Sequence, residues 1–215
     1  MAEYIEPMFS VPIFHLYAAD WEEKKEKLIE IASRANFERK EGEYCPSDYY
    51  DEQQSYWYEL QPLITPEIQR FVDRTGENFM VDRFWFERGG PGQCHLVHNH
   101  GATGYSAVMY IEFDEEEHEP THFICPFNEF TQGLQQSYVP RDIKSGSVIF
   151  FPSAIHHYTV PSQSEKPRLI LSWNLAYSKV IQFADTLPSV DILQPTPIDQ
   201  TELPTQKPRI KLNYV

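Results

Sequence analysis

The stretch Gly92-Gln93-Cys94-His95-Leu96-Val97-His98-Asn99-His100 contains the pattern around which the fold can be predicted. His98 and His100 are one residue apart, and side chains on an extended strand repeat with a period of two. Both imidazoles can therefore reach one small cation at about 2.0–2.1 Å. A pair of histidines on a strand can also be a polar pair at a sheet edge, so a third ligand is needed to indicate a metal site.

The composition is that of a folded chain rich in strands. The chain has 215 residues, 41% of them hydrophobic and 14% aromatic, which fits one domain with a sizeable core. The aromatic content, with only 9 Gly, favours strands over a helical bundle. The 32 acidic and 18 basic residues give a formal net charge of −14, which argues against binding to nucleic acid or to an anionic membrane.

The cysteines and the N-terminus predict a cytoplasmic protein. Cys45, Cys94 and Cys125 form an odd, sparse set without metal-knuckle spacing, which favours a reducing compartment. Residues 1–6 have no basic region and no apolar run of signal length. No segment contains the about 18–20 apolar residues that a membrane span requires.

A short strand and a helix are predicted at the start of the chain. Residues 8–16 form the strand, which Pro12 interrupts, so an edge position is expected. Asp20 and Glu23 predict a capping-box start for a helix that runs to about Asn36.

A second helix is predicted after a polar, Tyr-rich segment. Residues 37–60 show no clean period and are interpreted as loop and short strand near the mouth of a site. Thr65 should then cap the helix, with Pro66 at its first position and the end near Gly76.

From residue 79 onward the sequence pattern predicts a mainly β fold. Strands are expected at the histidine-bearing stretch and at residues 79–88, 105–113, 121–125, 134–139, 147–152, 156–160 and 168–176. Short strands at such regular spacing predict a β-sandwich or barrel.

After residue 183 the composition changes again. Five prolines break any continuous helix or central strand, and apolar residues recur between them. We therefore predict a domain at 1–183 and an extended, Pro-rich arm at 184–215. The arm offers a surface for its own domain, a second copy or an assembly partner.

Two later residues complete a candidate site. His157 begins a predicted strand that a jelly-roll core can place beside His98 and His100, and imidazole ligands suit Fe, Zn, Cu and Ni. Arg168 alternates with Ile170 and stands among apolar residues, so it needs an anionic partner. That partner is either a ligand carboxylate or an acidic side chain of the protein.

The segment from Trp85 to Asn174 resembles the iron- and 2-oxoglutarate-dependent oxygenases, in particular a His-x-His branch found in marine bacteria and phages. That branch has His-x-His, then Ser-Gly-Val-Tyr-Tyr, then Phe-Pro-Ser-x-x-x-His, and then Arg with Ser and Asn on alternate positions. The chain has the corresponding pieces in order: His98-Asn99-His100, Ser106-Ala107-Val108-Met109-Tyr110, Phe151-Pro152-Ser153-Ala154-Ile155-His156-His157, and Arg168 followed by Ser172 and Asn174.

The resemblance implies a double-stranded β-helix, or jelly roll, that holds Fe(II) with three histidines and uses 2-oxoglutarate as cosubstrate. His98, His100 and His157 would be the metal ligands, with no further catalytic residue. Arg168 would bind the C5 carboxylate of 2-oxoglutarate, with Tyr110 as a candidate second contact, and Ser172 and Asn174 would line the same face. The substrate would be an amino-acid side chain or a small molecule.

Three departures from the family pattern bear on the site. His100 stands where better-known members have a carboxylate, which makes the ligand set neutral. Ile170 stands where a hydroxyl often assists the arginine. Ala107 and Met109 replace the usual Gly and Tyr near the pocket.

The remaining candidates are expected to lie outside the site. On a regular strand His95 would face away from His98, and His118 and His122 flank an acidic turn at the surface. Cys94 and Cys125 are interpreted as small apolar groups, since no basic partner is adjacent.

The sequence thus favours a dioxygenase, with two alternatives. One is a non-catalytic jelly roll that uses its C-terminal arm for binding or assembly; encoded by a phage, it would act in the host cytoplasm or the virion. The other is a cupin-like metalloenzyme that uses three histidines without a 2-oxo acid.

Overall fold

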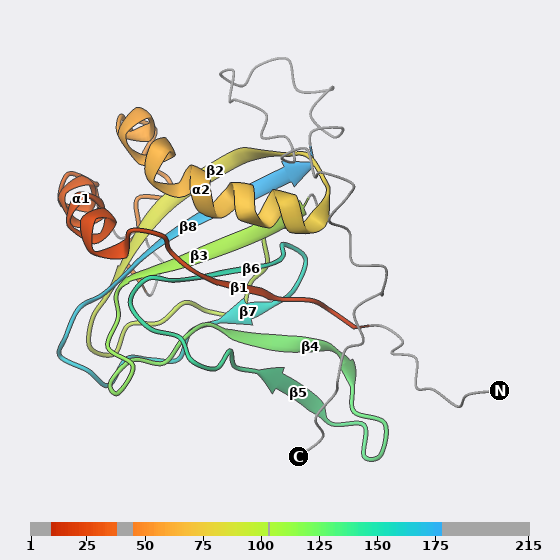
Figure 1. Ribbon diagram of the computed structural model, residues 1–215. Coiled ribbons are helices and arrows are strands. Elements are labelled where there is room, and N and C mark those ends of the chain that lie inside the picture. Colours follow the sequence, from red (N-terminus) through yellow and green to blue (C-terminus); the bar gives the residue numbers. More distant parts are fainter. Residues whose placement is uncertain (1–9, 38–44, 103, 178–215) are drawn as a thin grey trace.

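The computed structural model describes residues 10–37, 45–102 and 104–177. In these ranges the chain forms two helices and eight strands (Figure 1): β1 Phe14–Tyr17, α1 Trp21–Ser33, α2 Trp57–Thr75, β2 Phe79–Gly89, β3 Gly104–Glu112, β4 His122–Asn128, β5 Gln135–Tyr138, β6 Ser147–Pro152, β7 His157–Tyr158 and β8 Arg168–Tyr177. The predicted arm at 184–215 and the domain boundary at 183 lie outside the described residues and stay predictions.

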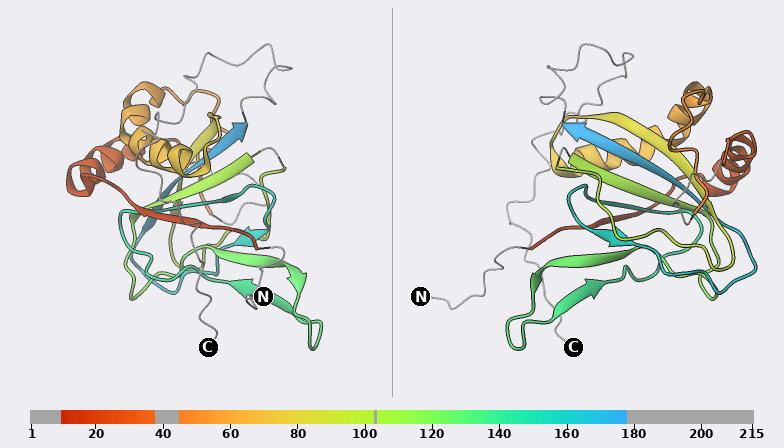
Figure 2. Two further views of the ribbon diagram at one scale, coloured as in Figure 1. Left: turned by 45° about the vertical axis from the view of Figure 1, so that its right-hand side comes forward. Right: turned by 180° about the vertical axis from the view of Figure 1, so that it is seen from behind.

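Two antiparallel sheets form the framework. The larger sheet has the order β1-β6-β3-β8-β2, and the smaller sheet has the order β5-β4-β7. Both helices lie on the outer face of the larger sheet, and the smaller sheet lies on its other side (Figures 1 and 2). The mainly β prediction with two N-terminal helices is therefore confirmed, and the arrangement is consistent with a jelly roll.

The larger sheet is buried on both faces, which explains why its strands are almost continuously apolar. Along β6, Val148 and Phe150 join the core under the helices, whereas Ile149 and Phe151 join the core between the sheets. β3 alternates in the same way, because successive side chains on a strand point to opposite faces. The buried polar side chains on these strands, such as Glu87, Arg168 and Ser172, are therefore exceptions to the apolar pattern.

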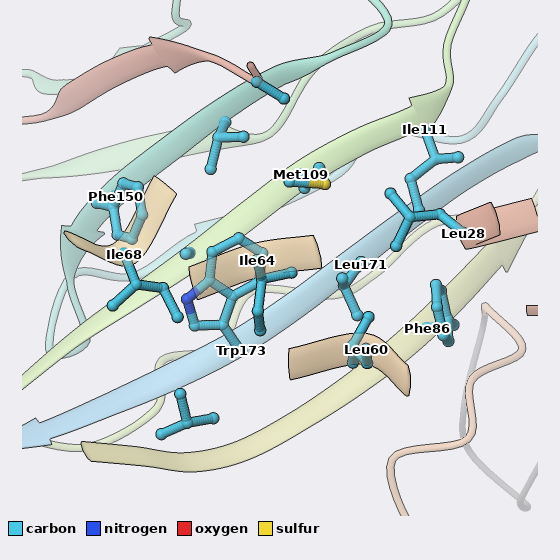
Figure 3. Packing of buried hydrophobic residues seen from close by; sticks show 14 of the residues in the cluster. Leu28, Leu60, Ile64, Ile68, Phe86, Met109, Ile111, Phe150, Leu171 and Trp173 are labelled. Atoms are coloured by element: carbon cyan, nitrogen blue, oxygen red, sulfur yellow. The ribbon is translucent and has the colours of Figure 1, made fainter. Parts of the chain in front are cut away.

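Helix α2 packs on the sheet through a single apolar stripe. Leu60, Ile64 and Ile68 project onto the sheet residues around Leu171 and Trp173 (Figure 3). Spacings of three and four residues place such side chains on one face of a helix.

The predicted start of this helix was wrong. The helix begins at Trp57, so Pro62 and Pro66 lie inside it, and the hydroxyl of Thr65 donates to the carbonyl of Gln61 (2.8 Å) instead of capping. Burial of the apolar stripe offsets the two backbone hydrogen bonds that the prolines remove. The end at Gly76 is confirmed: its φ is 69° and its N–H donates to the carbonyl of Val72 (2.8 Å).

Two expectations near the N-terminus need correction. Asp20 precedes α1 in a left-handed conformation (φ 51°) and makes no side-chain capping bond, so the predicted capping box does not form. The first strand is shorter than expected, but it pairs only with β6 at the edge of its sheet, as Pro12 indicated.

Most of the later strands lie within one to three residues of their predicted ends. The histidine-bearing stretch is the exception, since it contains only an isolated bridge between His98 and His157. Among the helices of the described ranges, none has both the length and the apolar character needed to cross a membrane.

The packing of α2 yields a stability prediction. Leu60 is fully buried, whereas Tyr58 on the same helix is 86% exposed. Leu60→Ala should lower the free energy of unfolding by about 2–5 kcal/mol, since it removes buried methyl groups and leaves a cavity. Tyr58→Ala should change it by less than about 0.5 kcal/mol. Urea denaturation measures both, and equal losses would contradict the packing.

Candidate metal centre

Three imidazoles converge between the two sheets. One ligand nitrogen from each of His98, His100 and His157 lies within 4.8 Å of the other two. The ring centroids are 5.2 Å apart for His98 and His100, 4.3 Å for His98 and His157, and 4.9 Å for His100 and His157. The structure therefore brings together the three residues that the sequence predicted as metal ligands.

Backbone hydrogen bonds fix the two ligand-bearing segments. The N–H of His98 donates to the carbonyl of His157 (3.0 Å), and the N–H of His157 donates to the carbonyl of His98 (2.9 Å). The N–H of His100 donates to the carbonyl of Ser153 (2.9 Å). The expected strand is thus replaced by a short irregular ladder along β7.

Two of the imidazoles have a defined tautomer. Nδ1 of His98 lies 2.7 Å from the carbonyl oxygen of Leu96, and Nδ1 of His157 lies 2.9 Å from that of Ile155. A carbonyl can only accept, so both Nδ1 atoms carry a proton and both Nε2 atoms keep a lone pair. Partners of this kind orient the histidine ligands of metal sites.

His100 is oriented by side chains of the larger sheet. Its Nδ1 lies 2.8 Å from both the Oδ1 of Asn174 on β8 and the Oγ of Ser106 on β3. Ser106 is in turn 2.9 Å from the hydroxyl of Ser153. Asn174 was predicted to line the cosubstrate pocket, but its amide oxygen is engaged with His100.

Burial keeps the three imidazoles neutral. Desolvation lowers the pKa of His157 to about 3 and that of His98 to about 4, and it lowers the pKa of His100 as well. Neutral imidazoles do not lose a proton on binding a cation. Three neutral nitrogen donors at this spacing fit a divalent transition metal.

Arg168 lies at the start of β8 and is only 6% exposed. Its Nη1 is 3.4 Å from Oε1 of Glu87, so an acidic side chain of the protein is indeed one partner. Its Nε and Nη2 atoms have no hydrogen-bond partner in the described part of the chain. Buried guanidinium nitrogens are rarely left unpaired, so Arg168 lacks a partner that an anionic ligand could supply.

Tyr110 faces Arg168 through its ring. The Cζ atom of Arg168 is 5.7 Å from the ring centroid. The hydroxyl of Tyr110 donates to Oγ1 of Thr121 (3.0 Å) and accepts from the N–H of Thr121 (3.1 Å). Because Thr121 already engages the hydroxyl as donor and as acceptor, Tyr110 contributes its ring surface to the pocket more readily than the predicted polar contact.

Two cavities flank the site. A cavity of about 20 Å³ lies beside the three histidines and is also lined by Glu87, Ile170 and Ser172. A second cavity of about 170 Å³ is lined by Arg168, and Thr159 contributes to both. Ser172 therefore lies where the sequence placed it.

Sequence reasoning missed two residues of the site, His95 and Glu87. The ring of His95 is 4.2 Å from that of His98, because the segment is not a regular strand; the predicted outward orientation of His95 is wrong. Nδ1 of His95 is 3.0 Å from Oε2 of Glu87 on β2. A glutamate directly after Phe84-Trp85-Phe86 in a buried strand was the available signal.

Glu87 remains ionised although it is only 2% exposed. Burial alone would raise its pKa, but the hydrogen bond with His95 and the charges of His95 and Arg168 lower it to about 2. The carboxylate therefore carries its negative charge into the space between Arg168 and the histidines.

His118 also differs from its predicted surface position. It is buried, its Nδ1 accepts from the N–H of Asp114 (3.0 Å), and its Nε2 lies 3.1 Å from the carbonyl oxygen of Lys166. These bonds tie the acidic turn to the loop before β8, which is a structural role.

A family comparison agrees with this geometry. Residues 83–174 match the model of the family described as "Putative 2OG-Fe(II) oxygenase". The match covers less than half of the chain and supports a relation of this part to the 2OG-Fe(II) oxygenase superfamily. Among curated protein sequences, none matches the chain significantly.

Solved structures share the fold. The epimerase SnoN from nogalamycin biosynthesis has a TM-score of 0.60 at 14% identity, over 88% of this chain and 92% of that chain. HygX from Streptomyces hygroscopicus, solved with nickel, 2-oxoglutarate and hygromycin B, has a TM-score of 0.61 at 10% identity, over 78% and 84%. The viral collagen prolyl hydroxylase of Paramecium Bursaria Chlorella virus-1 has a TM-score of 0.54 at 15% identity, over 77% and 95%.

The metal ligands can be tested with neighbouring histidines. His157→Ala should remove high-affinity binding of Fe(II) or Mn(II), because two imidazoles remain and a buried cation needs its full ligand set. His156→Ala is the matched control, since His156 is exposed. Anaerobic calorimetric titration measures both; metal binding that survives in the His157 variant would exclude this centre.

The support of His100 can be tested separately. Asn174→Ala should weaken metal binding by about 10–100-fold, because outer partners of ligating histidines have effects of this size. Asn99→Ala removes an exposed amide that contacts His156, not a ligand. A comparable loss of metal affinity in both variants would contradict a specific role for Asn174.

Proposed function

We propose that this protein binds Fe(II) through Nε2 of His98, His100 and His157 and uses 2-oxoglutarate to hydroxylate an amino-acid side chain or a small molecule. The observation that carries the proposal is the presence, in one region between the sheets, of three neutral imidazoles and a buried arginine with two unpaired nitrogens. The family match over residues 83–174 supports the same chemistry.

Arg168 would bind the distal carboxylate of 2-oxoglutarate. The unpaired Nε and Nη2 atoms form one edge of the guanidinium, and such an edge can donate in parallel to both oxygens of a carboxylate. Ser172, Ile170 and Thr159 would line the path from this edge to the histidines.

The bound metal would supply open positions at which the 2-oxo acid and O₂ are brought together. The protein's own contribution is to hold and shield the reactants. Carbonyl groups of Leu96 and Ile155 keep His98 and His157 in the required tautomer. The rings of Trp85 and Phe151 pack on His100 (5.3 Å) and His157 (4.8 Å) and exclude water from that side.

An apolar part of the substrate would bind beside His157. A groove of about 390 Å³ is lined by apolar residues from β4, from the end of β6 and from the segment before β1. Phe123 and Phe151 belong both to this groove and to the wall around His157, with ring separations of 5.9 and 4.8 Å. Val11, Ile13, Phe127 and Tyr138 extend the apolar lining outward.

An anaerobic titration tests the proposed function. Addition of Fe(II) and 2-oxoglutarate to the protein should produce a visible charge-transfer band, and admission of air should yield succinate. Arg168→Lys should raise the apparent Kd for 2-oxoglutarate by at least about tenfold, because lysine cannot form the bidentate contact. Arg88→Lys, on β2 near Glu112, is the matched control.

Two outcomes would redirect the proposal. Without the band and without succinate, the oxygenase is excluded. Metal-dependent O₂ uptake that is indifferent to 2-oxoglutarate would instead favour the cupin-like alternative.

A further inference from the structure

We propose that Glu87 is a positioning residue that sets the affinity and selectivity of the site for the distal carboxylate of 2-oxoglutarate. This inference rests on the proposed function, in which Arg168 binds that carboxylate. It concerns a residue outside the metal ligands and outside the arginine itself.

Glu87 divides its carboxylate between two groups of the site. Oε1 lies 3.4 Å from Nη1 of Arg168, and Oε2 lies 3.0 Å from Nδ1 of His95. β2 fixes the backbone of Glu87 opposite Ile170 of β8, so the side chain has to point between the sheets at the level of the cosubstrate path. One buried anion thus stands between the arginine and the histidines.

The contact with Glu87 determines which edge of Arg168 is available. Nη1 is occupied, whereas Nε and Nη2 are buried without a partner among the described residues. A ligand carboxylate can therefore approach only the Nε/Nη2 edge. This restriction fixes the direction from which the five-carbon 2-oxo acid extends toward the histidines.

The available space also depends on Glu87. The cavity beside the histidines measures about 20 Å³, and one water occupies about 10–15 Å³ of such volume. Glu87 and His95 both line that cavity. A cosubstrate that reaches from the histidines to Arg168 would therefore lie alongside the Glu87 carboxylate.

The charge of Glu87 opposes the binding of a second carboxylate. The Glu87 carboxylate offsets part of the positive charge around Arg168, so an incoming anion meets less positive potential than it would without Glu87. Two unit charges a few ångströms apart in a protein interact strongly enough to change an affinity by at least about tenfold. A cosubstrate analogue without the distal carboxylate would not experience this repulsion.

Calorimetric titration of the Mn(II)-loaded protein, under argon, with 2-oxoglutarate and with 2-oxopentanoate tests the inference. The two ligands share the 2-oxo acid group and the chain length, and only the first has a distal carboxylate. Glu87→Gln should lower the Kd for 2-oxoglutarate by about tenfold and should not lower the Kd for 2-oxopentanoate. The ratio of the two constants should therefore rise by at least about tenfold.

Two further variants keep the result interpretable. Glu112→Gln removes an equal charge from the end of β3, where Glu112 contacts Arg88, and should leave the ratio unchanged. Glu87→Asp keeps the charge but withdraws it from Arg168 by one methylene, and should raise the ratio about two- to threefold. This milder variant provides the test if the glutamine variant does not fold.

The outcomes separate the two proposals. If the unmodified protein binds 2-oxoglutarate and the ratio stays constant in both Glu87 variants, the role of Glu87 is purely structural and this inference is wrong. An equal change in both constants leads to the same conclusion. If the unmodified protein does not bind 2-oxoglutarate, the proposed function fails, and the inference fails with it.

Discussion

The reciprocal backbone bridge between His98 and His157 is the constraint on which the rest of the site depends. It pairs an irregular segment with the free edge of β7, so that this segment lies beside the three strands of the smaller sheet as a fourth. The same two residues are ligand candidates, so pairing of the backbone and convergence of the imidazoles are one event. Because each Nδ1 bonds to a nearby carbonyl, the fold also fixes which nitrogen faces the metal. The tautomers of His98 and His157 that a cation requires are thus set before it binds.

A second constraint is electrostatic, and it joins the two ends of the site. Buried Arg168 and Glu87 and half-buried His95 form a chain of contacts that reaches the ring of His98. In this chain Glu87 satisfies one nitrogen of the guanidinium and leaves two others without a partner in the described ranges. Desolvated donors that lack partners favour the binding of an anion.

The sequence was informative wherever local chemistry decided the outcome. Apolar runs separated by turns located most strands, since a buried strand needs apolar residues whatever its neighbours are, and Gly76 marked a helix end because the left-handed conformation there favours glycine. Local rules failed where packing competed with them. Pro66 lies inside α2 because the stripe of Leu60, Ile64 and Ile68 gains more from burial than the helix loses at its prolines. His95 turned toward His98 because the expected strand gave way to a single bridge.

For the site, the sequence alone determined the identity and order of its main parts: three histidines and an arginine, on segments that a jelly roll can bring together. Residue type, spacing and the family resemblance together were enough for this, because they specify the ligand chemistry and the order of the parts along the chain. Only the tertiary structure decided which of these residues contact one another. It assigned Asn174 to His100, left Tyr110 as a wall, and placed Glu87 between Arg168 and His95. The reason is that a buried charge takes its partner from whichever strand lies opposite, and strand pairing is a property of the whole fold.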